Sequence, residues 1–530
     1  MRSRRLSRQI PLSLIVLGSL LLAVPFHLRP ENFIVDDGYF YPQIARHIVH
    51  GAGSTFNGIM PTNGYHPLWM GICVIAAWIT SSSDALIQIL ATVQDLLLVG
   101  SLALIVSMAR TVKLRGAVLG CVPVLFVGMV LGIWRLLETN LAFALQLGVL
   151  ILVVPLFPDL QKRLAGWRNP LIGALLGLVM LARLDLVFFV LTVLLYELFH
   201  KDDSLSGTSR LTRCVVQGSI VGALLVPYLA WNWKTFHHLL PISGAIKSSF
   251  PHVQHWGLAP FMYPVVAAIL LNSSLLFKPV RTGFDTVCLL TAAAAALHMM
   301  YTLSFGELAP WYLTTGYLTV SLCTIWVADW LLQRAPGLAW IEPALASVLF
   351  LAFLLLGTVR LLSNFSYTHL RTGQVSLHGT YLEPKRALAE KLNETLPPGS
   401  RIMIFDAPGG VAFYSRMSIL PIDGLVSDYA YNRDVVSDTL IGYMSKQHID
   451  YFLAPYLHAG QSFDRLHLRG IGTANGQVMT VEAPLTHLSA GAITLADADL
   501  VLRFRQINPD MQTIYPEIGV WRIPHPVNTR

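Results

Sequence analysis

Long apolar runs separated by short polar connectors dominate the first 362 residues of this 530-residue chain. An apolar run of about 17–25 residues is long enough to cross a lipid bilayer as a helix. Only 13% of all residues are charged, against about 25% in soluble domains. The sequence therefore predicts a polytopic α-helical membrane protein with about 11–13 transmembrane helices. The candidate segments are 11–28, 67–80, 84–108, 116–134, 140–157, 170–183, 184–199, 214–231, 256–275, 284–304, 311–331 and 340–362.

Basic residues concentrate in the N-terminal tail and in short connectors, and the formal net charge is +7. Cytoplasmic loops carry such an excess of Lys and Arg, so the charge needs no nucleic acid to explain it. With the N-terminus inside, the loop at residues 29–66 lies outside. Two full crossings at 67–80 and 84–108 would then place Arg110 and Arg115 outside, against the rule. One of these two segments is therefore expected to be a partial or re-entrant helix.

The composition changes after residue 362, where the chain becomes polar and mixed. Strand-like runs cover residues 401–407, 448–456, 500–507 and 518–523, and residues 381–396 have a helical pattern. We expect residues 1–362 to form the transmembrane domain and residues 363–530 a soluble α/β domain on the same side as loop 29–66. The pair Gly409–Gly410 favours a tight strand-to-helix turn over a phosphate cradle, because the Rossmann glycine spacing is absent.

An acidic pair, Asp36–Asp37, follows the first apolar segment. A carboxylate near low-dielectric surroundings and a second carboxylate has a raised pKa, which suits a general base. Alternatively, the pair binds a divalent cation, or the Asp-Asp-Gly triplet only starts a turn or caps the next helix. The residues alone leave these three interpretations open.

Further ionisable residues lie in or beside the apolar segments, where they are costly and often functional. Arg183 and Asp185 could instead simply pair with each other. Residues 231–250 form a connector outside the membrane, whose first half suits an interfacial anchor. Lys247, at the end of this connector, could neutralise a departing phosphate. The full set of further ionisable residues considered as functional candidates is Glu138, Arg183, Asp185, Glu307 and Lys247.

Taken in order, these motifs resemble the GT-C superfamily of integral-membrane glycosyltransferases, and the resemblance spans nearly the whole chain. Arabinofuranosyl- and mannosyltransferase-like members are the most similar subgroup. Two departures are Leu137, where the family often has Met, and Asp-Asp in place of Asp-Glu or Glu-Asp. The matching motifs are Asp36-Asp37-x-Tyr39, PTNGYHPLW, LLETN at Glu138, LARLD at Arg183 and Asp185, PISGAIK through Lys247, Trp311-Tyr312, and PIDGLVSD in the last domain.

The resemblance implies an inverting sugar transfer from a polyprenyl-phosphate donor to a glycan, lipid or protein acceptor. Asp36 or Asp37 would be the base, with Asp36 favoured because it aligns with the leading acid of Asp-Glu relatives. The residues expected to bind donor phosphate or sugar are Lys247, Arg183, His66 and Tyr39. Supporting residues are Glu138, Asp185, Glu307, Trp311 and Tyr312. No cofactor is certain; the candidate is Mg²⁺ or Mn²⁺, held by Asp36, Asp37 and Glu138.

The expected location is the bacterial cytoplasmic membrane, with the active site and the C-terminal domain on the periplasmic side. A different class, a membrane transporter or a lipid or glycolipid flippase, would use the intramembrane charges to line a path. Transporters often contain internal repeats, and no repeat is evident in this sequence. The transferase is therefore the preferred hypothesis.

Overall fold

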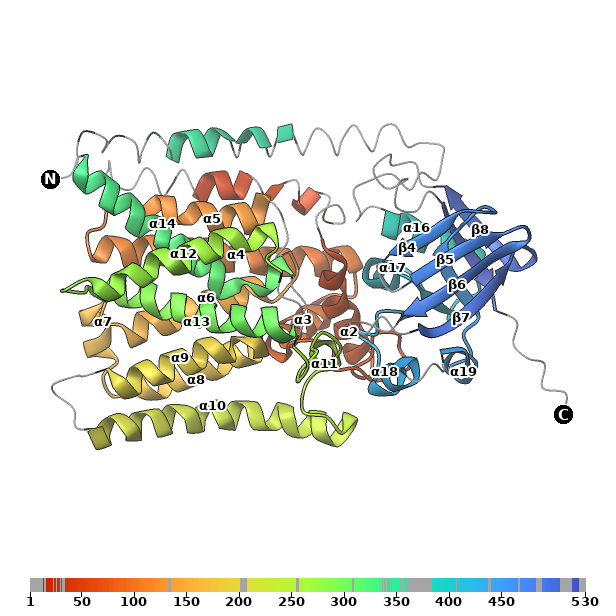
Figure 1. The fold of residues 1–530 in the computed structure, drawn as a ribbon, viewed down its shortest axis with the longest axis horizontal. Coiled ribbons are helices and arrows are strands. Elements are labelled where there is room, and N and C mark those ends of the chain that lie inside the picture. The colour runs from red at the N-terminus through yellow and green to blue at the C-terminus, as the bar shows by residue number, and fades with distance from the viewer. Residues whose placement is uncertain are drawn as a thin grey trace.

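Helices occupy one end of the elongated molecule and a domain with two β-sheets occupies the other (Figure 1). The computed structural model describes the chain in continuous ranges, together with scattered residues between 13 and 30 and between 337 and 359. The continuous described ranges are 34–130, 135–200, 207–253, 257–306, 309–335, 384–406, 408–436, 440–465, 468–482, 489–505 and 517–523.

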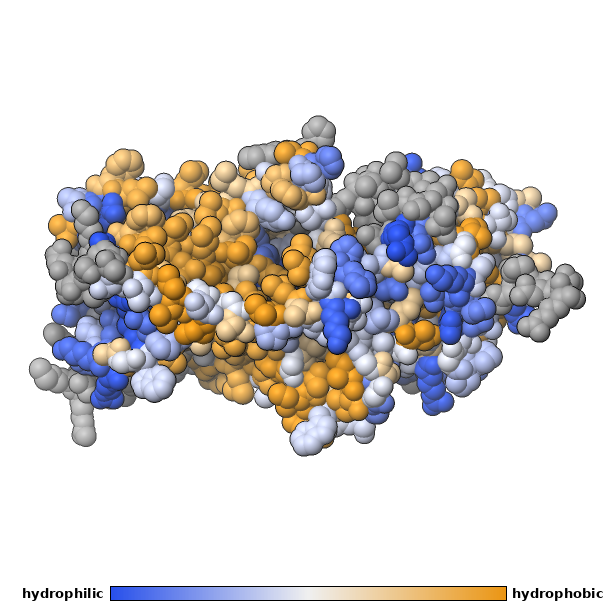
Figure 2. All heavy atoms as spheres, turned by 90° about the horizontal axis from the view of Figure 1, so that it is seen from below, coloured by the Kyte–Doolittle hydropathy of each residue, from blue (hydrophilic) through white to orange (hydrophobic). Residues whose placement is uncertain are grey.

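Within the described residues, five helices are long and apolar enough to cross a membrane. Figure 2 shows apolar side chains covering much of this half of the molecule. The predicted polytopic helical architecture is therefore confirmed, whereas the number of crossings stays a prediction. The five are α4 (Ser83–Thr111), Ser209–Phe236 within α10 (Gly207–Phe236), Pro260–Phe277 around α12 (Tyr263–Ser273), α13 (Gly283–Phe305) and α14 (Thr314–Arg334). Shorter helices include α3 (Pro67–Ile79), α5 (Cys121–Leu125), α6 (Thr139–Val153), α7 (Pro158–Arg163), α8 (Arg168–Ala182) and α9 (Val187–Phe199).

Helix α3 begins and ends beside the C-terminal domain. Its N-cap, His66, lines the same cavity as Leu425 of that domain. Just past its other end, the side chain of Asp84 in α4 accepts a hydrogen bond of 3.0 Å from Arg386. The 13 residues of α3 span only about 20 Å, less than the hydrocarbon core. These contacts favour a partial helix at α3, while α4 is long and apolar enough to cross a membrane. The crossing itself stays a prediction.

Basic connectors gather at the helix ends that lie away from the C-terminal domain. The backbone N–H of Arg115 donates to Asp329 near the end of α14. Arg168 and Arg213, at the starts of α8 and α10, both pair with the buried Glu197 near the end of α9, at 3.2 Å each. This is the distribution expected if that end faces the cytoplasm.

The C-terminal domain contains one mixed sheet and one antiparallel sheet. In the mixed sheet, of order β2-β1-β3-β9-β8, β1 is parallel to β2 and β3, while β9 is antiparallel to β3 and β8. The strands are β1 (Arg401–Ile404), β2 (Ser418–Pro421), β3 (Tyr451–Pro455), β8 (Leu500–Arg505) and β9 (Glu517–Arg522). The antiparallel sheet has β4 (Ser462–Arg465), β5 (Leu468–Thr473), β6 (Gly476–Glu482) and β7 (Ser489–Ala496) in that order. Helices α16 (Pro384–Thr395), α17 (Pro408–Tyr414), α18 (Tyr429–Val436) and α19 (Leu440–Lys446) accompany them.

The domain packs directly on the loop that follows the first apolar segment. This loop contains the 3-10 helix η2 (Asp36–Tyr39) and helix α2 (Phe40–Val49). Thr62 donates to the carbonyl of Ser427 at 3.0 Å, and Ser418 donates to the carbonyl of Asn57 at 2.8 Å. Helix α17, between β1 and β2, packs on both η2 and α2. The soluble domain thus forms one wall of the region in which the acidic pair lies.

Candidate active site

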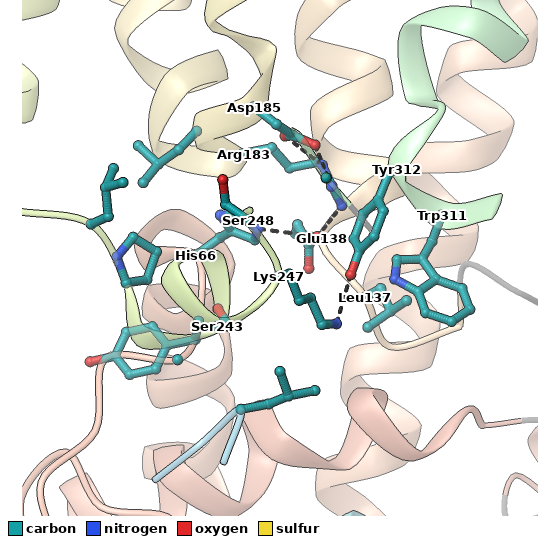
Figure 3. A pocket seen from close by; sticks show the side chains of 18 of the residues that line it. His66, Leu137, Glu138, Arg183, Asp185, Ser243, Lys247, Ser248, Trp311 and Tyr312 are labelled. Carbon is teal, nitrogen blue, oxygen red and sulfur yellow. Dashed lines mark hydrogen bonds and ion pairs between the residues drawn. The ribbon is translucent and has the colours of Figure 1, made fainter. Parts of the chain in front are cut away.

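A cavity of about 400 Å³ lies where helix ends of the membrane half meet the C-terminal domain (Figure 3). The loop before α3, the start of α6, the turn between α8 and α9, and the short helix α11 (Ile242–Ile246) all contribute to it. The predicted residues that line it are Asp37, His66, Glu138, Arg183, Asp185, Lys247, Trp311 and Tyr312. Segments far apart in the sequence are therefore brought to one place.

Arg183 is the centre of a buried ionic network. Its side chain is 2% exposed, and it bonds to Asp185 through Nε at 3.0 Å and Nη2 at 2.6 Å. Its Nη1 donates to Glu138, which is equally buried. Removing one partner would leave a buried charge uncompensated, at a cost of about 3–5 kcal/mol. Arg183 and Asp185 do pair, as their spacing suggested, but Glu138 belongs to the same network.

Two further side chains hold Glu138 in place. The hydroxyl of Tyr41 donates to Glu138 at 2.7 Å, and His66 Nε2 lies 3.7 Å from the same carboxylate. The buried Nδ1 of His66 has no hydrogen-bond partner among the described residues. His66 therefore retains a polar atom at the cavity wall that a bound molecule could satisfy.

Lys247 lies close to Asp37. Its Nζ donates to the hydroxyl of Tyr312 at 2.7 Å and lies 3.9 Å from Asp37 Oδ2. Tyr312 also lies beside Arg183, whose guanidinium carbon is 5.3 Å from the centre of the ring. The arrangement gives the cavity an acidic group and a primary amine within reach of one small molecule.

The two adjacent aspartates have different surroundings. Asp36 is buried, and its carboxylate accepts hydrogen bonds from the backbone N–H groups of Gly409 at 2.8 Å and Gly410 at 3.1 Å. Asp36 does not line the cavity, whereas Asp37 does. The expected preference for Asp36 as the base is therefore not supported by this geometry. Gly409 and Gly410 lie in the first turn of α17, in agreement with the predicted strand-to-helix turn, and their N–H groups donate to a carboxylate of the chain itself.

A carboxyl group of the C-terminal domain also approaches this region. Burial is the main cause that raises the pKa of Asp423 to about 7. The negative charges of Asp37 and Asp36 act in the same direction, and the Leu425 N–H and Lys247 oppose the rise. Asp423 follows β2 and precedes Leu425, which lines the cavity. It lies in the PIDGLVSD motif, but sequence alone gave no reason to bring this motif next to Asp37.

The remaining predicted residues lie elsewhere or take other roles. Tyr39 is buried, with its ring centre 5.6 Å from that of Phe413, and it does not line the cavity. Glu307 lies outside the described residues. Residues that line the cavity but that the sequence did not single out include His298, 3.4 Å from Asp185, and Tyr41. Neither stands out in sequence, because one lies inside an apolar helix and the other in an aromatic run.

Asp37 and Glu138 line the same cavity, but two of the three proposed cation ligands have other partners. Asp36 is occupied by backbone N–H groups, and Glu138 is bound by Tyr41 and Arg183. In the part of the chain that the structure describes, no group of three or more His, Cys, Asp or Glu side chains could hold a metal ion. A Mg²⁺ or Mn²⁺ ion bound by Asp36, Asp37 and Glu138 therefore stays a prediction, for which the described residues offer no three-ligand cluster.

Comparisons with known proteins identify the architecture. Neither protein-family models nor curated proteins give a match. Among solved structures, ArnT from Cupriavidus metallidurans bound to undecaprenyl phosphate matches with a TM-score of 0.56 and 13% identity, over 83% of this chain and 92% of ArnT. ArnT is a GT-C glycosyltransferase. This chain has a GT-C fold.

Two other structures are also similar. ArnT in the apo state matches with a TM-score of 0.52 and 12% identity, over 83% of this chain and 91% of ArnT. An oligosaccharyltransferase from Archaeoglobus fulgidus in the apo form has a TM-score of 0.49 and 13% identity, over 84% of this chain and 69% of that one. The GT-C fold predicted from the ordered motifs is confirmed, and the arabinofuranosyl- or mannosyltransferase-like subgroup stays a prediction.

Proposed function

We propose that this protein is a membrane glycosyltransferase that moves a sugar from a polyprenyl-phosphate donor to an acceptor hydroxyl. The observation that carries the proposal is the approach of Asp37 and Lys247, 3.9 Å apart, in a cavity at the membrane end of a GT-C fold. ArnT, with the same fold, binds undecaprenyl phosphate. The acceptor is a glycan, lipid or protein of the cell envelope, and the site faces the periplasm of a bacterial cell.

Asp37 acts as the general base. Its carboxylate takes the proton of the acceptor hydroxyl as the oxygen attacks the anomeric carbon of the sugar. The bond between that carbon and the phosphate oxygen breaks, and the polyprenyl phosphate leaves with the electron pair. Attack opposite the phosphate inverts the anomeric centre. Asp37 suits this role better than Asp36 because it lines the cavity.

Lys247 stabilises the departing phosphate. Its ammonium group is positioned by Tyr312 at the cavity wall, and a preorganised cation in a partly dry site stabilises developing negative charge. Arg183 has Glu138 and Asp185 as partners, so its charge is already compensated. We assign Arg183 mainly to shaping the site through Glu138, Tyr41 and His66.

The side of the cavity formed by the start of α9 suits a lipid chain. Val187 and Phe188 line the cavity, and Val187 is 42% exposed. Tyr301, also in the lining, has its ring centre 5.4 Å from that of Phe188. An apolar wall that continues to the lipid-facing surface would let a polyprenyl tail stay in the bilayer while its phosphate reaches Lys247.

The proposal is tested by incubating purified protein in nanodiscs with radiolabelled polyprenyl-phosphate pentoses and hexoses and a cell-envelope extract. We expect release of polyprenyl phosphate together with transfer of label to the extract. A parallel liposome assay measures movement of the same lipids between leaflets. Lipid movement without label transfer would contradict the transferase and support the flippase alternative.

A further inference from the structure

A second hollow, of about 460 Å³, lies on the other side of α2 from the candidate active site's ionic network. Its wall comes from both halves of the molecule: α2 and the loop after it, the α3–α4 connector, and residues 415–418 before and in β2. The basic side chains in its lining are Arg46, His47, His50 and Arg416, and the lining contains no Asp or Glu.

Arg46 is partly buried in this wall without a carboxylate partner. Its guanidinium donates to Ser83 Oγ at 2.7 Å, the carbonyl of Phe413 at 2.6 Å and Gln43 Oε1 at 2.5 Å. It makes no ion pair with any residue that the structure describes. Burial lowers the pKa of Arg46 to about 10, so it remains protonated at neutral pH. A desolvated cation without a counter-charge is unfavourable until an anion approaches it.

Arg416 and His50 face the same hollow from opposite halves. Both are exposed, and the guanidinium of Arg416 has no hydrogen bond or ion pair with a described residue. His50, which also lines the hollow, donates from Nδ1 to the carbonyl oxygen of Arg46 at 2.7 Å. The planar donor fork of Arg matches phosphate oxygens well.

The hollow borders an apolar surface. Ser81, in its lining, follows α3, whose residues Ile75, Trp78 and Ile79 are 62%, 79% and 64% exposed. These three positions lie on one face of the helix because they are spaced three and four apart. Large exposed apolar side chains next to uncompensated cations are typical of the level where lipid headgroups meet the acyl region.

We propose that this hollow binds a phosphate group at the membrane surface, separate from the donor phosphate in the cavity beside Lys247. The ligand is a phosphate monoester or diester, carried by a lipid headgroup or free in solution. Arg416 and Arg46 supply the charge, and the hydroxyl of Ser81 supplies a further hydrogen-bond donor. The site is independent of the transferase proposal, because it involves none of the residues assigned to the reaction.

The test uses the full-length protein and measures binding rather than activity. Phosphatidylglycerol and phosphatidylcholine are titrated in detergent and followed by native mass spectrometry, and inorganic phosphate is titrated in a separate thermal-unfolding experiment. The variant Arg416→Ala is expected to fold, because its side chain is exposed. Arg433→Ala removes another exposed arginine of the same domain, outside the hollow, and is the control for the loss of one positive charge.

We expect Arg416→Ala to weaken binding of phosphatidylglycerol, inorganic phosphate or both by about tenfold or more, because a charged hydrogen bond is lost. Arg433→Ala should leave the binding of both probes unchanged. Loss confined to phosphatidylglycerol identifies a lipid phosphate, and loss confined to inorganic phosphate identifies a soluble one. Equal binding by wild type and Arg416→Ala, or absence of binding of either probe, would overturn the proposal.

Discussion

At the residue scale, neighbours in the sequence can face different partners. Asp36 and Asp37 begin a 3-10 helix, in which successive side chains point about 120° apart because each turn contains about three residues. One carboxylate therefore meets the backbone of α17 while the next faces the cavity. The sequence pointed to the pair as a candidate for the base, but it could not separate the two roles.

Asp423 makes stability depend on pH. Its pKa rises from 3.8 to about 7 in the folded protein, chiefly because it is buried. The folded state thus favours the protonated form, and this contribution to stability is complete below about pH 4 and is lost as the pH rises through about 7. We expect Asp423→Asn to be more stable than wild type at pH 8, by at most about 4 kcal/mol, and to match it near pH 4.

Thermal unfolding of both proteins across this pH range measures the effect. Asn can still accept the N–H bond that Leu425 donates at 2.9 Å to Asp423, so the loop should keep its geometry. A stability difference that does not change with pH would show that Asp423 is not protonated on folding.

Lys247 gives a prediction about turnover. We expect Lys247→Met to lower kcat by about 10²-fold or more, because a preorganised donor for the leaving group is lost. Tyr312→Phe should have a smaller effect, since it removes the hydroxyl that positions Lys247 but keeps the ring. Steady-state kinetics on a polyprenyl-phosphate sugar would measure both. An unchanged kcat for Lys247→Met would remove Lys247 from the proposed reaction.

At the scale of elements, α17 joins the two halves of the molecule. An added Cβ on Gly409 would lie 2.3 Å from the main-chain oxygen of Asp36, so backbone would have to move. We expect Gly409→Ala to destabilise the protein by about 1–3 kcal/mol and to reduce turnover. Gly442→Ala is the matched control, because nothing lies within 4 Å of its added Cβ. In helix α19 it should be neutral or stabilising by about 0.5–1 kcal/mol. Equal unfolding temperatures for the two variants would contradict the close approach.

Hydropathy predicted the elements better than it predicted their contacts. Segments 84–108 and 284–304 correspond to α4 and α13, because a lipid-soluble helix must be apolar along its length. Strand patterns at 401–407 and 448–456 correspond to β1 and β3. The bonds from Gly409 and Gly410 to Asp36 span more than 370 residues. No local pattern encodes such a contact, so the role of Asp36 had to come from the structure.

At the scale of the whole molecule, the central feature is that the candidate active site and the C-terminal domain lie at the same end of the molecule. Because α3 begins and ends at that end, Ser81 and the C-terminal domain should be on one side of the membrane and Lys113 on the other. In a background without native cysteines, Ser81→Cys should react with an impermeant maleimide in spheroplasts, and Lys113→Cys only after lysis. Reaction of both in intact spheroplasts would contradict this topology.

The most direct test of the account compares Asp37→Asn with Asp36→Asn in the same membrane preparation. Release of polyprenyl phosphate and the unfolding temperature are measured for each variant. We predict that Asp37→Asn folds normally but loses about 10²-fold or more of its activity. Asp36→Asn should mainly lose stability, because it weakens the charge-assisted bonds to Gly409 and Gly410. Wild-type activity in Asp37→Asn would contradict the assignment of Asp37 as the base.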